Sequence, residues 1–193
     1  MLMAVRLLAL VPLVVVSACA DGSGAGSGDA PVPLTPDGIA AVVADHVDRE
    51  PKRVDPWDVM TRELEVDAPG AALSFGRGDF LGVAVAPTTD SPLVCGDRSF
   101  FDECVDVEHD GSDLVLAWQE LEPEEDPGVV YVIDRRDDED VIAHYSGASI
   151  TGDPRELDLG VTVDEMADIV TDARLTLGRA ELAFGGCRLC CVD

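Results

Sequence analysis

Residues 106–113 carry the side chains best suited to bind a hard cation. Oxygen-bearing side chains stand at the first, third and fifth positions and glycine at the sixth, which is the spacing of a calcium loop. Ala117 occupies the twelfth position, where such a loop needs a bidentate glutamate. The same stretch contains Asp-Gly, a common hairpin-turn pair, so a turn is the favoured interpretation and a cation site the alternative. The candidate ligands are Asp106, Glu108, Asp110 and Asp113.

Signatures of catalysis are scarce in this sequence. It contains no G-x-S-x-G, no H-E-x-x-H and no phosphate-binding Gly-Lys-Ser/Thr loop. With 39 carboxylates, a histidine beside a carboxylate arises by chance and is weak evidence of acid–base catalysis. We therefore expect no enzymatic activity and no cofactor. The three histidines are His46, His109 and His144.

The first nineteen residues have the layout of an export signal. Arg6 and the amino terminus supply positive charge, and residues 7–16 form an apolar run. A helix of ten residues is about 15 Å long, half of the ~30 Å hydrocarbon thickness of a bilayer, so this run is too short for a permanent span. We expect it to be cleaved.

The end of this run, Val16-Ser17-Ala18-Cys19, resembles the lipobox of bacterial lipoproteins, in which one apolar and two small residues precede an obligatory cysteine. The family prefers leucine where Val16 stands. The resemblance implies that residues 1–18 are removed and that Cys19 becomes a lipidated N-terminus on the outer face of the cell membrane. Two acyl chains, at about 0.8 kcal/mol per buried methylene, anchor a protein durably.

A tether and a strongly acidic domain are expected after Cys19. Residues 19–34 begin with a run rich in glycine and serine, which predicts a flexible tether. The chain has 13 Lys plus Arg against 39 Asp plus Glu, a net charge of −26. Such a surface repels phosphate backbones and anionic lipids, which argues against nucleic-acid partners and a polybasic membrane contact.

Five cysteines remain beyond the lipobox, and an oxidising compartment favours disulfides over zinc thiolates. A bridge between Cys95 and Cys104 would close a short loop. One thiol of the C-terminal cluster is then left over and becomes available to another chain, because adjacent cysteines pair poorly and Cys187 takes one of the other two. The cluster lacks the context of a redox site. Its members are Cys187, Cys190 and Cys191.

Two amphipathic helices are expected near the ends of the domain. Thr35 is a potential N-cap followed by a proline and an acid, and Pro51 stops the first helix. Thr162 and Glu165 have the spacing of a capping box, and apolar residues at helical spacing continue from there to Gly178, which ends the second helix.

Six runs with strand character lie between these helices, separated in pairs by turn signals. Three consecutive hairpins predict an α+β fold. It consists of an antiparallel sheet of about five to six strands with two amphipathic helices on one face and a largely solvated opposite face. We expect a single domain over residues 35–193. The strand runs are residues 72–75, 80–86, 105–107, 114–118, 129–133 and 141–145.

The whole organisation resembles uncharacterised actinobacterial lipoproteins, on the basis of the lipobox, the tether, the acidic domain and an excess of arginine over the single lysine, Lys52. This resemblance implies no particular activity. We expect a lipid-anchored cell-envelope protein that acts as a non-enzymatic interaction module, with an envelope protein or a small ligand as its partner. The alternative is a cation- or small-ligand-binding lipoprotein that uses two acidic runs, residues 122–126 and 134–140.

Overall fold

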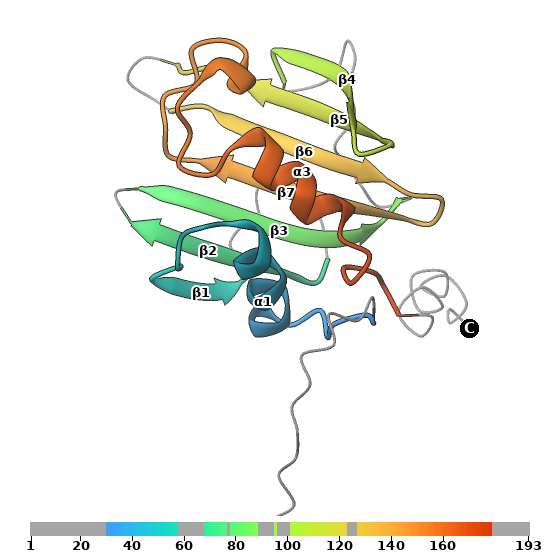
Figure 1. The fold of residues 1–193 in the computed structure, drawn as a ribbon. Coiled ribbons are helices and arrows are strands. Elements are labelled where there is room, and N and C mark those ends of the chain that lie inside the picture. The colour runs from blue at the N-terminus through green and yellow to red at the C-terminus, as the bar shows by residue number, and fades with distance from the viewer. Residues whose placement is uncertain are drawn as a thin grey trace, which may run out of the picture.

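Seven antiparallel strands form one open sheet in the computed structural model, which describes residues 30–57, 68–76, 78–88, 95, 101–122 and 127–178 (Figure 1). The strands lie in the order β1-β2-β3-β7-β6-β5-β4, and pairing of β3 with β7 joins the two halves. The three expected hairpins are present. The strands are β1 (Arg53–Pro56), β2 (Gly70–Gly76), β3 (Asp79–Pro87), β4 (Glu103–His109), β5 (Ser112–Gln119), β6 (Val129–Arg135) and β7 (Glu139–Ser146).

The α+β class and the antiparallel sheet are confirmed, but the sheet has seven strands instead of five to six. The additional strand is β1, an edge strand of four residues that pairs only with β2. Its sequence, Arg-Val-Asp-Pro, has one apolar side chain and ends in proline, which lacks the N–H needed in a central strand. β1 is a strand because it pairs with β2, and no local sequence pattern predicts it.

The first helix, α1 (Pro36–His46), begins as expected. The Thr35 hydroxyl accepts a hydrogen bond from the Gly38 N–H, and proline occupies the first turn, where its missing N–H costs nothing. The helix ends at His46, before Pro51, and the N–H of Val47 caps it by bonding to the Val43 carbonyl. Its apolar face packs against β2 and β1.

The second helix, α3 (Val163–Thr171), has the expected capping box but ends earlier than predicted. The guanidinium of Arg136 donates to the carbonyl oxygens of Val170 and Asp172, which satisfies C-terminal carbonyls that a longer helix would have used itself. The apolar residues beyond this point, Leu175 and Leu177, are still buried, although they lie outside any helix or strand.

Both helices cover the same face of the sheet, as Figure 1 shows, with α1 over β1 and β2 and α3 over β6 and β7. Between helices and sheet lies the main apolar core. Met166 and Ile169 of α3 and Ile39 of α1 are fully buried there, opposite Leu116, Val132 and other inward-facing strand residues. This layer fixes where the helix side chains meet the strands.

The opposite face of the sheet is not largely solvated, and this part of the prediction is wrong for the described residues. Directly paired Gly82, His144 and Tyr131 lie side by side on it, and His144 and Tyr131 are at most 4 % exposed. Trp57 packs over Gly82, where a Cβ would collide with the indole ring, and Phe101 stacks edge-on against Tyr131. Aromatic residues from connecting segments therefore close this face.

The folded part also includes residues that we expected in the tether. The N–H of Val32 donates to the carbonyl of Arg174 at 3.1 Å, and Val32 and Leu34 pack against the main core. The domain boundary thus falls a few residues before Thr35.

Candidate functional site

The calcium-loop residues lie on a β-hairpin between β4 and β5. Asp110 and Gly111 form its two-residue turn with φ angles of 48° and 86°, the positive values of a type I′ turn. Alternation along β4 places Asp106 and Glu108 on the face opposite the helices, and Asp113 stands directly across from Glu108. Within the described residues, these three carboxylates do not converge with the carboxylate of Asp110 on a common point.

Asp110 instead joins a cluster on the helix-bearing face. His109, the last residue of β4, points toward α3, and its Nε2 lies 2.7 Å from Oδ1 of Asp168. One ligand atom from each of His109, Asp110 and Asp168 lies within 4.8 Å of the others. The His109 and Asp168 side chains are 20 % and 44 % exposed, so an ion could reach them from solvent.

Sequence reasoning missed Asp168 because it lies 59 residues from His109. The capping box at Thr162 and Glu165 starts α3, and packing of its apolar face on β6 and β7 turns Asp168 toward the hairpin. The alternation of β4 places His109 on the same side. Neither signal alone predicts the pairing of His109 with Asp168, because that pairing depends on where α3 crosses the sheet.

Two surface depressions flank β4, one on each face of the sheet. The depression on the helix side has a volume of about 310 Å³ and lies beside the cluster, with Val107 and Val163 on its floor and Asp164 at its rim. The depression on the other face has a volume of about 350 Å³ and is lined by Cys104, Val115 and other residues of this edge. Both are open and shallow.

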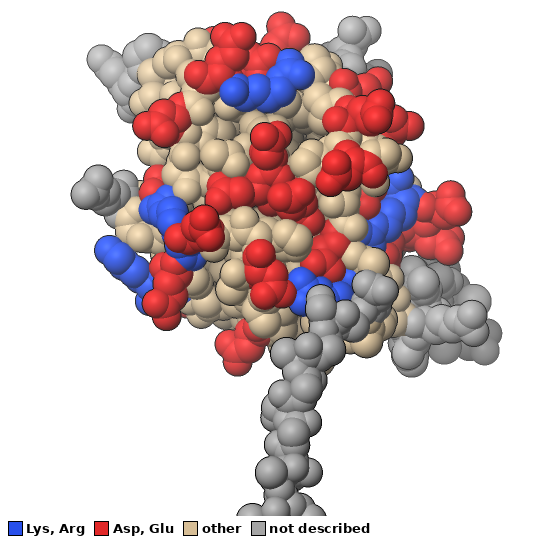
Figure 2. Space-filling model, in the orientation of Figure 1, with Lys and Arg blue, Asp and Glu red and all other residues tan. Residues whose placement is uncertain are grey.

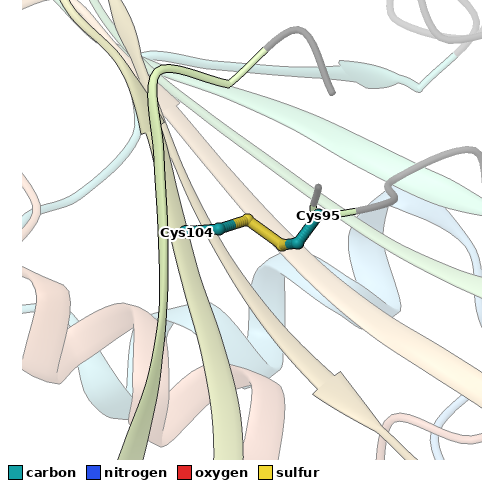
Figure 3. The surroundings of a disulfide bond; sticks show 2 residues. All are labelled: Cys95 and Cys104. Atoms are coloured by element: carbon teal, nitrogen blue, oxygen red, sulfur yellow. A yellow bond between two sulfur atoms is a disulfide. The ribbon is translucent and has the colours of Figure 1, made fainter. Parts of the chain in front are cut away.

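The Cys95–Cys104 pair forms a disulfide on that second face (Figure 3). The Cα atoms are 5.9 Å apart, within the range that a bridge requires. The bridge ties exposed Cys95 to the edge strand β4. The remaining cysteines lie outside the described residues: Cys19, Cys187, Cys190 and Cys191.

A network of ionic groups joins the ends of the two helices. Asp172 accepts hydrogen bonds from Arg174 at 2.7 Å and from His46 at 2.9 Å, and Arg174 also reaches Asp45. Burial works to raise the pKa of the Asp172 carboxyl, but the bonds from Arg174 and His46 outweigh burial and hold this pKa below its ordinary value. His46 and Asp172 therefore serve as a structural tie.

The turn of the acidic run 134–140 is solvated, at exposed Asp137 and Asp138, and the other carboxylates of the run are part of the fold. Asp134 and Glu139 form ion pairs with Arg136 at 2.8 and 3.1 Å, and Glu139 also accepts the N–H of Leu177. Asp140 is fully buried and accepts a hydrogen bond from the Thr88 hydroxyl. Glu139 and Arg136 thus hold the end of α3 and the segment after it to the β6–β7 hairpin, and Asp140 holds Thr88, which follows β3. Most of the other acidic run, residues 123–126, lies outside the described residues.

His144 is buried in the aromatic layer. Its ring centroid lies 4.7 Å from that of Tyr131 and 5.9 Å from that of Phe80, and Nδ1 has no hydrogen-bond partner in the described part of the chain. Burial lowers its pKa from 6.5 to about 3. The imidazole is neutral at physiological pH, and no carboxylate of the described residues bonds to its Nδ1.

Tyr145 of β7 belongs to a further cluster of polar side chains, next to Asp79 at the start of β3. Its hydroxyl donates to Asp79 at 3.1 Å and accepts the N–H of Gly160 at 3.0 Å, while Arg49 donates to Asp79 and to the Gly160 carbonyl. Burial raises the pKa of Tyr145, and the Asp79 charge adds to that effect. All these bonds hold the segment before α3 to the sheet.

Comparison with protein-family models, with curated proteins and with solved structures finds no match to this chain. Among the described helices, α1 and α3 included, none has the length and apolar character needed to cross a membrane.

Proposed function

We propose that this protein is a lipid-anchored, non-enzymatic protein of the outer face of the cell membrane, whose acidic domain presents an interaction surface. The anchor rests on the sequence Val16-Ser17-Ala18-Cys19 and on the glycine-rich segment behind it. A tether suits this domain, since an anionic bilayer repels a body of net charge −26.

The observation that carries the interaction role is that the described arginines are largely matched by carboxylates, while an excess of carboxylates remains exposed on the surface. Five described arginines are each paired with a carboxylate, and two of these pairs, Arg49–Asp79 and Arg174–Asp45, join elements that are distant in the sequence. The acidic excess is exposed, and Figure 2 shows acidic side chains spread across the helix-bearing face. The paired arginines are Arg49, Arg53, Arg136, Arg155 and Arg174.

Two of the three histidines, His46 and His144, do not compete with this role. Asp172 is held by Arg174 as well as by His46, so it is not free to orient a catalytic imidazole. His144 is 4 % exposed and neutral, which keeps it from exchanging protons with a bound molecule. Among the described residues, most of the exposed charged side chains outside the ion pairs are carboxylates, with Lys52 an exposed cation among them, and carboxylates recognise cations and basic groups.

Fractionation of cells that produce the full chain tests the anchor. We expect the protein in the membrane fraction after a high-salt wash, and the Cys19→Ala variant outside it. Cys191→Ala, which removes a cysteine outside the lipobox, is the matched control and should leave the protein in the membrane. Retention of Cys19→Ala in washed membranes would show that the apolar run itself is the anchor.

A second candidate function, cation binding, is favoured by the convergence of His109, Asp110 and Asp168 within 4.8 Å. An imidazole with two carboxylates suits Zn²⁺ or Mn²⁺ better than Ca²⁺, which prefers oxygen ligands alone. We expect Zn²⁺ to raise the melting temperature more than Ca²⁺ or Mg²⁺ does, and the increment to disappear in His109→Ala but not in His46→Ala. An equal increment in His109→Ala would exclude this site.

A further inference from the structure

Among the residues that the structure describes, the sheet has an open edge at β4, seven residues long. β4 is the last strand in the sheet order and pairs only with β5, as Figure 1 shows at the border of the sheet. The other border strand, β1, has four residues and ends in proline, which protects it from pairing. The β4 edge carries no proline and is the longer unpaired border within the described residues.

The hairpin turn determines which backbone groups of β4 face outward. In a two-residue type I′ hairpin, the residues next to the turn, His109 and Ser112, form a hydrogen-bonded pair. Every second residue of β4 then bonds to β5, and the residues between direct their N–H and C=O groups away from the sheet. These outward residues are Cys104, Asp106 and Glu108.

The two depressions lie where the side chains of an additional strand, paired with β4, would project. A strand added to β4 would send alternate side chains to opposite faces of the sheet. On the helix side they would meet the depression of about 310 Å³, whose floor includes Val107, Val163 and Ala167. On the other face they would meet Asp106 and the depression of about 350 Å³ beside the disulfide.

The charge along this edge selects the occupant. The carboxylates of Asp106 and Glu108 are exposed, stand on the face away from the helices, and form no ion pair with described residues. Asp113 lies directly across from Glu108 and adds to the negative field. Arg155, which borders the helix-side depression, is already paired with Asp153. Arg135 lines the depression on the face away from the helices, so basic side chains fit beside Asp106 and Glu108 and not within that depression. Apolar side chains fit the helix side.

A second copy of the chain is a poor occupant. Antiparallel pairing of two β4 strands about a two-fold axis at Asp106 would bring its carboxylate against the same residue of the copy. Like charges directly opposite each other destabilise a strand pair. The same acidic residues therefore disfavour self-association and favour a basic strand.

We propose that the outer edge of β4 binds an extended segment of a partner protein as an eighth strand, with Arg or Lys alternating with apolar residues. The basic side chains lie opposite Asp106 and Glu108, and the apolar ones enter the helix-side depression. Backbone bonds to Cys104, Asp106 and Glu108 fix the register. This inference names the partner chemistry of the interaction surface and rests on the proposed function.

A synthetic peptide of alternating arginine and valine, as long as β4 (7 residues), is the probe. Its binding to the purified full chain is measured by calorimetry in the presence of a chelator, together with hydrogen exchange of the protein amides. We expect binding, with slowed exchange at the amides of Cys104, Asp106 and Glu108. The same peptide with N-methylated backbone positions keeps its charge but cannot pair, and it should bind at least tenfold more weakly.

Two substitutions at one position separate charge from backbone bonding. Asp106→Asn removes the charge and should weaken binding about two- to fivefold. Asp106→Pro also removes the outward N–H and should weaken binding about fivefold further, while the β4–β5 ladder stays intact. Asp48→Asn is the charge control. Asp48 is an exposed acid that follows α1 in the sequence, at the other end of the sheet, so its substitution should have little effect on peptide binding.

Equal binding of the N-methylated peptide would overturn the proposal, because it would show attraction to the net charge alone. Binding without slowed exchange at the three β4 amides would also overturn the proposal. This measurement uses the wild-type protein, so it does not depend on whether a variant folds. A dimer of the full chain that Asp106→Pro abolishes would assign the edge to a second copy instead. These readouts do not depend on lipidation, so loss of membrane anchoring in the fractionation test is a separate failure.

Discussion

Acidification is expected to destabilise this protein through one buried imidazole. His144 is 4 % exposed, packs against Tyr131 and Phe80, and has no hydrogen-bond partner for Nδ1 in the described part of the chain. Burial lowers its pKa from 6.5 to about 3. Between these values the unfolded chain binds a proton at His144 and the folded chain does not.

The free energy of unfolding should therefore fall as the pH falls. Because the folded-state pKa is depressed, the contribution of His144 is complete above pH 6.5 and is lost progressively as the pH approaches 3. One such proton changes the unfolding free energy by about 1.4 kcal/mol per pH unit. Two units of acidification, to about pH 4.5, cost roughly 3 kcal/mol, a large part of the 5–15 kcal/mol typical of a folded domain.

Urea unfolding of the wild type and of His144→Phe at several pH values measures this effect. Phenylalanine fills a similar volume and does not titrate, and the carboxylates titrate alike in both proteins. The wild type should lose about 3 kcal/mol more than the variant between pH 7 and about pH 4.5. Parallel pH profiles, within about 0.5 kcal/mol, would refute the assignment of a buried neutral imidazole.

Three further substitutions, with Arg53→Ala as the control for the first, test how the fold is held together, each by urea unfolding. Arg136→Ala leaves helix carbonyls and two carboxylates without their donor and should cost about 3 kcal/mol, whereas Arg53→Ala, an exposed pair, should cost less than about 1 kcal/mol. Gly82→Ala should destabilise by more than about 1 kcal/mol, because its Cβ would collide with Trp57; an unchanged stability would contradict that contact. Cys104→Ser breaks the disulfide that closes a loop with a sequence separation of 9, and it should lower the free energy of unfolding by about 2 to 3 kcal/mol. Under reducing conditions, the wild type and the variant should be equally stable.

Local signals in the sequence predicted most of the fold. The caps at Thr35 and Thr162 located both helix starts, and alternation between turn signals located six of the seven strands. What failed depended on distant contacts. β1 is a strand because β2 pairs with it, and α3 ends at Thr171 because Arg136, far along the chain, binds the carbonyls at its end.

In the candidate sites too, contacts that are local in the sequence could be predicted and distant ones could not. The close approach of Cys95 and Cys104 is local enough to infer from their spacing. The cluster of His109 and Asp168 is not, because it needs the angle at which α3 crosses the sheet. Burial of the second sheet face also escaped prediction, since the residues that cover it, such as Trp57, lie in connections without a periodic pattern.

Mass spectrometry of the N-terminal peptide, isolated from the membrane fraction of cells that produce the full chain, tests the central claim most directly. We expect a mature chain that begins at Cys19 and carries a diacylglyceryl thioether on its sulfur, with residues 1–18 absent. A chain that retains residues 1–18, or one cleaved elsewhere with an unmodified Cys19, would contradict the account of a lipid-anchored envelope protein.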